Sequence, residues 1–208
     1  MEHMTLLKLA AGSVAVLGVA GLLAIHLHNQ RRLPVAPLER DASALSHATR
    51  TLVVYFTRSG RTRSVAEAIA EETGADILEL RVVTPYPEAY HATVLQARRE
   101  IRDGYRPPLV LPLESLDKYD TLFVGTPNWW STVAPPVASF LTRFSLAGKT
   151  VIPFVTHGGG GLADCERDLQ ALCPGASFRP ALALKDADVP NAAQTVRDWA
   201  RNSLAPTP

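Results

Sequence analysis

The chain has 208 residues, of which 47% are hydrophobic, with 21 Lys and Arg against 20 Asp and Glu. This length fits one domain of ordinary size plus a short appendage, and a body of roughly 150 residues can bury a core without a disulfide or a metal. The near-zero net charge argues against non-specific binding to nucleic acid, so we expect no nucleic-acid partner.

An uncharged, apolar run from Leu9 to Ile25 is the first feature along the chain. As a helix, residues 4–27 would span about 36 Å, which is enough to cross a bilayer. We therefore expect residues 1–30 to form a transmembrane anchor. The alternative is a cleaved signal peptide with a weak small-x-small site at residues 18–20. A buried core helix is disfavoured because the run is apolar on every face.

Basic residues flank the apolar run unevenly. Arg31, Arg32 and Arg40 follow it, whereas Lys8 precedes it. The positive-inside rule then predicts a membrane-anchored protein whose body faces the cytoplasm, with export as the alternative. Residues 31–50 contain two prolines and no sustained periodicity, which is typical of a tether.

The body, residues 51–204, alternates short apolar runs with amphipathic stretches. Runs of this kind are typical of strands covered on both faces. We expect strands at 51–56, 77–83, 121–125, 150–155 and 178–184, and helices at 62–73, 88–102, 133–144, 162–172 and 192–202. Five strands alternating with five helices predict an α/β fold, a doubly wound five-stranded parallel sheet with helices on both faces. Ligands of such sheets bind beyond the carboxyl ends of the strands.

The loop after the first strand, residues 57–62, reads Thr-Arg-Ser-Gly-Arg-Thr and opens a helix. The free amides of a helix N-terminus attract anions, and Gly60 lets the backbone approach one closely. The loop adds three hydroxyl donors and no acid, so it predicts a phosphate site. The alternative is that a hydroxyl only caps the helix. The Walker pattern is absent.

The loop after the third strand, residues 126–132, carries Trp129 and Trp130 side by side. Two indoles exposed at the carboxyl edge of a sheet leave a large apolar area in contact with water, which is unfavourable unless a planar group covers them. We therefore expect an aromatic ring ligand here. The alternative is that the indoles pack on the neighbouring helix.

The loop after the fourth strand begins Thr156-His157 and continues with four glycines, residues 158–161. Such a backbone can wrap a planar ligand and donate amide hydrogens to it. A single histidine is more often structural than catalytic, so a direct role of His157 beside the ligand stays open.

Two cysteines, Cys165 and Cys173, lie eight residues apart in a predicted helix. Their Cα atoms would be about 12 Å apart, beyond the limit of about 7 Å for a disulfide. Neither has a partner at metal-ligand spacing. We expect buried structural thiols and no metal site.

The loop motifs belong to a longer ordered set. The pattern T-x-S-G-x-T after the first strand resembles the phosphate-binding signature of flavodoxins. Further matching motifs follow in order: Pro85-Tyr86-Pro87 with Tyr90, Glu100 with Arg106-Pro107, Tyr119-Asp120, Gly125-x-Pro127-Asn128-Trp129-Trp130, Gly148-Lys149-Thr150, Pro153-Phe154 and Thr156-His157-Gly158-Gly159. Together they cover about residues 51–184. The body is thus similar to the short-chain flavodoxin-like family, which includes flavodoxins and flavodoxin-type FMN and quinone reductases.

The resemblance implies the strand order 2-1-3-4-5 and a non-covalently bound FMN. Residues at matching positions would contact FMN from the three loops. The first loop would hold the phosphate through Thr57, Arg58, Ser59, Gly60, Arg61 and Thr62. The second would line the isoalloxazine ring through Thr126, Pro127, Asn128, Trp129 and Trp130. The third would close the other edge through Thr156, His157, Gly158 and Gly159.

Two residues depart from the family pattern. Arg61 stands where the family usually has Asn, which adds a cation near the phosphate. Ser131 stands where Gly is common, which makes the conformation of the second loop less certain.

The resemblance leaves three functional classes open. An FMN-dependent oxidoreductase would pass electrons through the flavin, with a quinone as one acceptor. A carrier flavodoxin would shuttle electrons between redox partner proteins, but such shuttles are typically strongly acidic, whereas this body is close to neutral. A scaffold that has lost the flavin is disfavoured by the intact hydroxyl loop. No G-x-G-x-x-G motif is present, so a nicotinamide donor would bind only transiently.

Overall fold

The computed structural model describes residues 50–205 of the chain. The predicted anchor, residues 1–30, lies outside the described residues, as does the predicted tether, residues 31–50, except for Arg50; both stay predictions. No helix within residues 50–205 combines the length and the apolar character needed to cross a bilayer.

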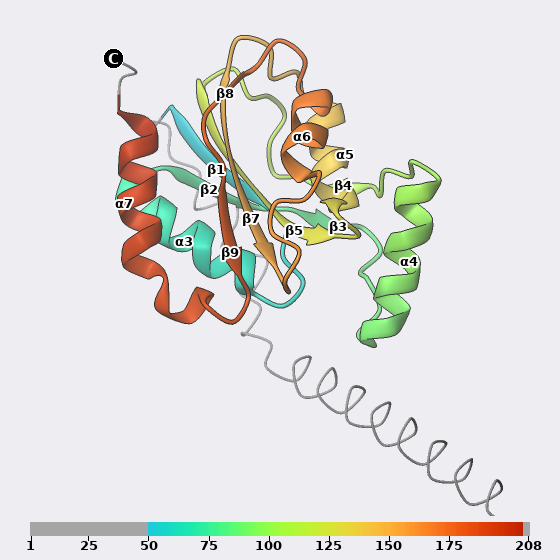
Figure 1. The fold of residues 1–208 in the computed structure, drawn as a ribbon. Coiled ribbons are helices and arrows are strands. Elements are labelled where there is room, and N and C mark those ends of the chain that lie inside the picture. The colour runs from blue at the N-terminus through green and yellow to red at the C-terminus, as the bar shows by residue number, and fades with distance from the viewer. Residues whose placement is uncertain (1–49, 206–208) are drawn as a thin grey trace, which may run out of the picture. The chain divides into compact units, whose positions relative to one another are not determined.

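Strands and helices alternate along the described chain (Figure 1). The elements are β1 (Thr51–Tyr55), α3 (Arg61–Thr73), β2 (Asp76–Glu79), β3 (Arg81–Val82), α4 (Tyr90–Arg102), β4 (Leu109–Val110), β5 (Thr121–Trp129), β6 (Thr132–Val133), α5 (Pro135–Arg143), β7 (Thr150–His157), α6 (Cys165–Leu172), β8 (Ser177–Phe178), β9 (Leu182–Lys185), a short 3-10 helix (Val189–Asn191) and α7 (Ala193–Leu204). All five predicted helices are confirmed, with ends shifted by up to three residues.

The central sheet has the predicted topology. Its strands run in the order β2-β1-β5-β7, followed by β8 and β9, and all of these pairings are parallel. In the predicted numbering this order is 2-1-3-4-5, which is confirmed. The register places Tyr55, the last residue of β1, opposite both Glu79 and Gly125. The carboxyl ends of the strands therefore meet at one edge, where the ligand loops were expected.

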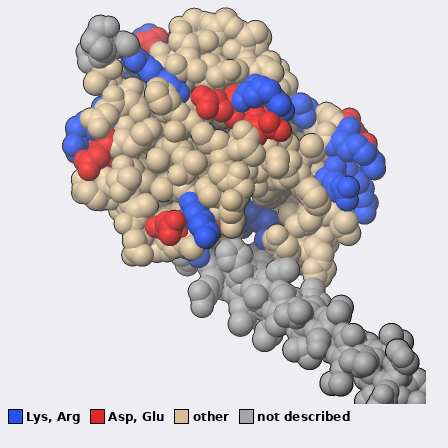
Figure 2. All heavy atoms as spheres, in the orientation of Figure 1, with Lys and Arg blue, Asp and Glu red and all other residues tan. Residues whose placement is uncertain are grey.

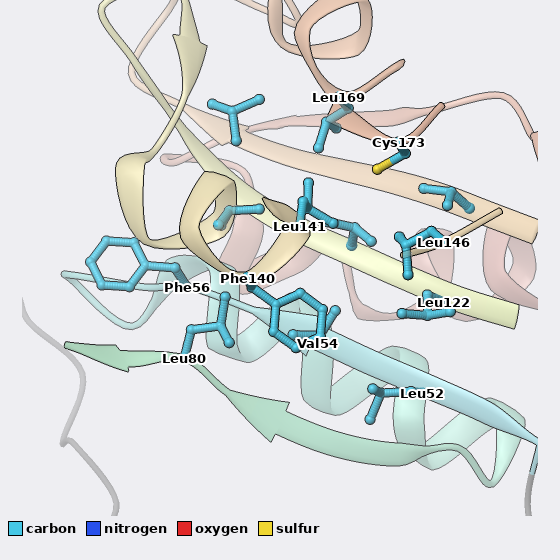
Figure 3. Close-up of a cluster of buried hydrophobic side chains, with 14 of the residues drawn as sticks. Leu52, Val54, Phe56, Leu80, Leu122, Phe140, Leu141, Leu146, Leu169 and Cys173 are labelled. Atoms are coloured by element: carbon cyan, nitrogen blue, oxygen red, sulfur yellow. The ribbon is translucent and has the colours of Figure 1, made fainter. Parts of the chain in front are cut away.

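Two hydrophobic cores lie on opposite faces of this sheet. Side chains of a strand alternate between faces, so Leu52 and Val54 of β1 join one core while Val53 and Tyr55 join the other. The first core lies beneath α5 and α6, as Figure 3 shows for Phe140, Leu169 and their neighbours. The second core lies beneath α3 and α7. Helices thus cover both faces, as predicted.

Two predicted strands are each divided in the structure. The run 77–83 splits at Leu80, because the chain leaves the edge of the sheet and β3 pairs antiparallel with β4 in a separate ribbon. The run 178–184 splits into β8 and β9 around Pro180, which has no amide hydrogen to donate. Hydrophobic pattern marks an extended segment but does not identify its partner strand, which explains the first difference. In the second, both halves still pair with β7, and only the segment around the proline leaves the ladder.

Both cysteines are buried and free of disulfide bonds, as expected. Burial raises the pKa of the Cys165 thiol to about 12 and that of Cys173 to about 11. Cys173 packs in the first core beside Leu169 (Figure 3). These thiols are structural hydrophobic groups.

Gly125 in the central strand β5 is required by packing. A Cβ atom there would lie 2.2 Å from Cζ of Phe154 and 2.8 Å from Cβ of Tyr55, and both of these side chains are buried. We expect Gly125→Ala to cost about 3 kcal/mol, the upper part of the range for overpacked cores, and to lower Tm by about 6–12 °C. Thermal unfolding measures this shift. Gly158→Ala is the control, because nothing lies within 4 Å of its added Cβ; an equal loss in both variants would contradict the packing argument.

Candidate ligand site

The structure brings the three predicted loops together at the carboxyl edge of the sheet. The hydroxyls of Thr62 and Thr156 share a hydrogen bond of 2.9 Å, which joins the first loop to the third. Nδ2 of Asn128 donates to the carbonyl of Gly161 at 2.9 Å, which joins the second to the third. Segments about 30 to 100 residues apart in sequence therefore form one continuous rim.

The first loop leaves the N-terminus of α3 open. Gly60 is the N-cap residue with φ 87°. Among residues 50–205 no side chain caps the helix, and the first turn of the helix contains no acid. Thr57 accepts a hydrogen bond from the amide of Gly60 at 3.0 Å, within the loop. The alternative reading, in which a hydroxyl serves only as the helix cap, is therefore wrong. An uncapped, positively polarised helix end of this kind is suited to an anion.

Individual side chains of this loop point to different neighbours. Arg58 turns towards α4: its Nε donates to Oγ1 of Thr93 at 3.2 Å, and its guanidinium lies 5.7 Å from the ring centre of Tyr90. Ser59 and Arg61 are half-buried, whereas Thr62 is buried against Thr156. The surface of the loop is thus formed by Thr57, Ser59 and Arg61, whereas Gly60 is buried and Thr62 holds the loop to β7.

The predicted second loop is a tight hairpin. β5 continues through Pro127, Asn128 and Trp129 and pairs antiparallel with β6. The turn consists of Trp130 (φ 54°) and Ser131 (φ 67°), both in the left-handed region that Gly adopts at least cost. Thr126 lies beneath the hairpin: it is fully buried and accepts the amide of Ala134 at 3.0 Å. This threonine therefore supports the hairpin and does not line the pocket described below.

The two adjacent indoles have different surroundings. Trp129 is half-buried and packs edge-on against Phe56 and Tyr86, with ring centres 5.4 and 5.1 Å apart. Trp130 is 49% exposed; its Nε1 donates to the carbonyl of Val94 at 3.1 Å, and the guanidinium of Arg98 lies 5.0 Å from its ring centre. The first indole extends the core, and the second leaves apolar area at the rim.

A pocket of about 300 Å³ opens between the first loop, the hairpin and α4. This volume lies at the small end of the range for small-molecule sites, about 300–1,000 Å³. Its lining comprises Arg58, Tyr90, Thr93, Val94, Ala97, Asn128, Trp129 and Trp130. Four of these were predicted from sequence. The other four residues belong to α4, and none of them was assigned to a site from the sequence. Tyr90, Val94 and Ala97 form an apolar stripe on that helix, and this stripe could have indicated that the face packs against something.

The third loop begins later than predicted, because β7 extends through Thr156 and His157. Nδ1 of His157 is buried and has no hydrogen-bond partner among the described residues. A Cβ atom at Gly158 or Gly159 would meet nothing within 4 Å, whereas one at Gly160 would lie 3.2 Å from Nδ2 of Asn128. An unpaired buried nitrogen beside an open glycine backbone indicates a place for a ligand with polar edges.

The charges around the pocket are basic. Arg98 and Arg99 are exposed on α4, as is Arg102, which is paired with Asp103 at 2.7 Å. Figure 2 shows Lys and Arg gathered where Figure 1 places this helix. Elsewhere on this face the two signs are interspersed. The described residues contain no cluster of three or more His, Cys, Asp and Glu that could hold a metal ion. The arrangement can therefore accept an anion and a flat ring, with basic groups at its edge.

Comparisons with known proteins agree with this arrangement. A family model described as flavodoxin matches residues 50–203. An NAD(P)H dehydrogenase (quinone) from Cupriavidus metallidurans is 34% identical over 98 residues, 46% of each chain. The chain spans about half the length of the curated relatives it matches.

Solved structures show the same likeness. A protein from Bacteroides uniformis, named a flavoprotein, is 32% identical with a TM-score of 0.65, over 73% of this chain and 97% of that one. A flavoprotein from Lactobacillus acidophilus, solved in complex with FMN, is 23% identical with a TM-score of 0.56, over 69% and 98% of the two chains. The second likeness is one of fold.

Proposed function

We propose that this chain, which belongs to the flavodoxin family, binds FMN at the carboxyl edge of its sheet and transfers electrons through it. The observation that carries the proposal is the uncapped N-terminus of α3 at one end of a rim that also holds an exposed indole. A phosphate at the helix and an aromatic ring beside the indole are the two ends of one FMN molecule.

The residues present fit this cofactor. The phosphate would be held by the amides of α3 with Thr57, Ser59 and Arg61, because an anion there completes the open helix end. Nδ1 of His157, which has no hydrogen-bond partner within the described part of the chain, and the free space at Gly158 and Gly159 suit the polar edge of the ring. A single phosphate site with no dinucleotide motif favours FMN over FAD.

A bound flavin supplies hydride and single-electron chemistry, and the protein tunes and orients it. Trp130 is more exposed than the half-buried Trp129, so it has more apolar area available to cover the ring. The side chain of Arg58, tied to Thr93 and to the carbonyl of Glu88, gives the pocket a positive wall. His157 offers a hydrogen-bonding nitrogen to the ligand. Together these groups orient a flat, electron-accepting ring and exclude water from one of its faces.

We further propose that the activity is that of an NAD(P)H-dependent reductase with a quinone-type acceptor. The curated relatives bear that name, and the basic groups on α4 suit an anionic donor such as a nicotinamide dinucleotide. A carrier flavodoxin that serves only protein partners is the alternative. The near-neutral composition and the basic rim are unlike the acidic docking surface of such a carrier.

The test is to purify the full-length protein and identify its cofactor. Denatured protein should release FMN at close to one per chain, and reconstituted protein should oxidise NADH or NADPH when a water-soluble quinone is present. Release of FAD, or no binding of added FMN, would contradict the cofactor assignment. FMN binding with no turnover of either nicotinamide would favour the carrier.

We also propose that the apolar run from Leu9 to Ile25 holds the body at a membrane, with the body in the cytoplasm because three arginines follow the run. Protease added to intact cells should then leave the body uncut, while the protein sediments with membranes. Digestion from outside, or a soluble chain that begins near Gly21, would support export instead.

A further inference from the structure

A buried ionic network lies directly behind the phosphate loop. Nε of Arg63 donates to Oε2 of Glu79 at 2.9 Å, and its Nη2 contacts both carboxylate oxygens at 2.7 and 2.9 Å. The Tyr55 hydroxyl donates to Oε2 of Glu79 at 3.0 Å. Arg63 is 5% exposed, Glu79 9% and Tyr55 3%, so two buried side chains hold the carboxylate away from water. None of these residues lines the pocket.

The three residues stand at the ends of the elements that bound the loop. Tyr55 is the last residue of β1, and Arg63 lies in the first turn of α3. The segment between them contains the whole phosphate loop. Glu79, the last residue of the neighbouring strand β2, accepts from both sides. One carboxylate therefore sets the distance between the two ends of the loop.

The energetics favour a role other than stability. A buried ion pair must repay the desolvation of both charges, and replacing one with apolar groups of similar size is often neutral or stabilising. A guanidinium in the first turn of a helix also opposes the helix dipole. Arg63 occupies such a position and needs Glu79 to neutralise it. Burial raises the pKa of Tyr55, so its hydroxyl stays protonated and keeps donating.

We propose that Arg63, Glu79 and Tyr55 are positioning residues that hold the phosphate loop in its binding geometry. The proposal rests on the assignment of this loop to the phosphate of FMN. Because Arg63 donates as a planar fork to both oxygens, the first turn of α3 cannot rotate without breaking the hydrogen bonds from Nε and Nη2. The amides of that turn are thereby kept in one orientation, ready for the anion.

Strand β2, which carries Glu79 at its carboxyl end, supplies a matched control at its amino end. Asp76, the first residue of β2, is also buried; it is paired with Lys118 at 2.9 Å and accepts the hydroxyl of Tyr119 at 2.6 Å. This second network holds a carboxylate, a cation and a tyrosine at the amino end of the sheet. The ligand loops lie at the carboxyl end, so changes in it should alter stability without a selective effect on phosphate.

The experiment measures the affinities of FMN and riboflavin for the full-length protein in detergent, stripped of flavin. Three variants are compared with the native chain: the apolar triple Tyr55→Phe/Arg63→Met/Glu79→Leu, the single Arg63→Lys, and the control pair Asp76→Asn/Tyr119→Phe. Thermal unfolding of each flavin-free variant is recorded alongside. The ratio of FMN affinity to riboflavin affinity isolates the contribution of the phosphate, because riboflavin lacks that group.

We expect the triple variant to keep a cooperative unfolding transition and to lose about tenfold or more in FMN affinity, with riboflavin affinity changed less than about threefold. Arg63→Lys keeps the charge but loses the fork, so its ratio should fall by several-fold. The control pair should leave the ratio unchanged. If the triple variant does not fold, the affinity ratio measured for Arg63→Lys tests the proposal by itself.

An unchanged ratio in the variants, or equal losses of both ligands, would overturn the positioning role. Failure of the proposed function is distinguishable: the native chain would then bind FMN no better than riboflavin, or bind neither.

Discussion

Ser59→Asp should weaken FMN binding by about 100-fold or more while riboflavin binding is nearly unchanged. The side chain lies in the phosphate loop just before the open end of α3 and is half-buried. A carboxylate about 4 Å from a phosphate is repelled by about 4 kcal/mol per unit charge at an effective dielectric of 20, and by about 1 kcal/mol in bulk water. About 1.4 kcal/mol corresponds to a tenfold change in affinity, so even partial screening leaves a large loss.

The matched control for this prediction is Ser59→Asn, which has nearly the same shape without the charge. Fluorescence titration of flavin-free protein with FMN and with riboflavin measures both affinities. The Asn variant should stay within a few-fold of the native chain for both ligands. Equal weakening of FMN and riboflavin by Asp would show that the loop is distorted and that the phosphate lies elsewhere.

Trp130→Ala should lower FMN affinity by about 30-fold, because covering an aromatic ring with an indole contributes about 2 kcal/mol or more from buried area and stacking together. Trp130 is 49% exposed at the rim of the pocket, so it has the area to cover a ring. Reduction adds negative charge to the flavin, which an electron-rich indole face disfavours. The variant should therefore also raise the reduction potential of the bound flavin and lose much of the fluorescence quenching caused by FMN.

The comparison that makes this prediction specific is Trp129→Ala. Trp129 packs against Phe56 and Tyr86, so its removal should leave a cavity and cost about 3 kcal/mol of stability in the flavin-free protein, a fall in Tm of about 6–12 °C. The Trp130 variant should unfold close to the native temperature. If instead Trp129→Ala abolishes quenching and leaves stability unchanged, the assignments of the two indoles must be exchanged.

Sequence pattern was sufficient for the fold because each local signal agreed with the others. The apolar runs at 51–56, 121–125 and 150–155 became the buried strands β1, β5 and β7, and the stripe in 62–73 became α3 against the second core. The strand order, which was predicted from the motif resemblance, is confirmed. Alternation of fully buried strands with amphipathic helices leaves few other ways to cover both faces of a sheet.

The sequence predicted which loops form the candidate site, but it did not predict what each side chain in these loops contacts. Residue types at the ends of strands indicated a phosphate and a ring, since parallel strands present their carboxyl ends at one edge. The sequence could not show that Thr62 bonds to Thr156 or that Thr126 is buried beneath the hairpin, because each of these depends on a partner far along the chain or on the local burial. The wall contributed by α4 was missed for the same reason.

By itself, the sequence determined which segments are extended or helical, which faces are apolar and which loops carry phosphate-binding chemistry, because these follow from local spacing and residue type. Only the tertiary structure decided which of two adjacent indoles stays exposed, which hydroxyls remain on the loop surface, and that Arg63 and Tyr55 share the carboxylate of Glu79. These outcomes depend on distances between residues that are neighbours in space and not in sequence. Local pattern carries no information on such distances, since they are set by how the elements pack.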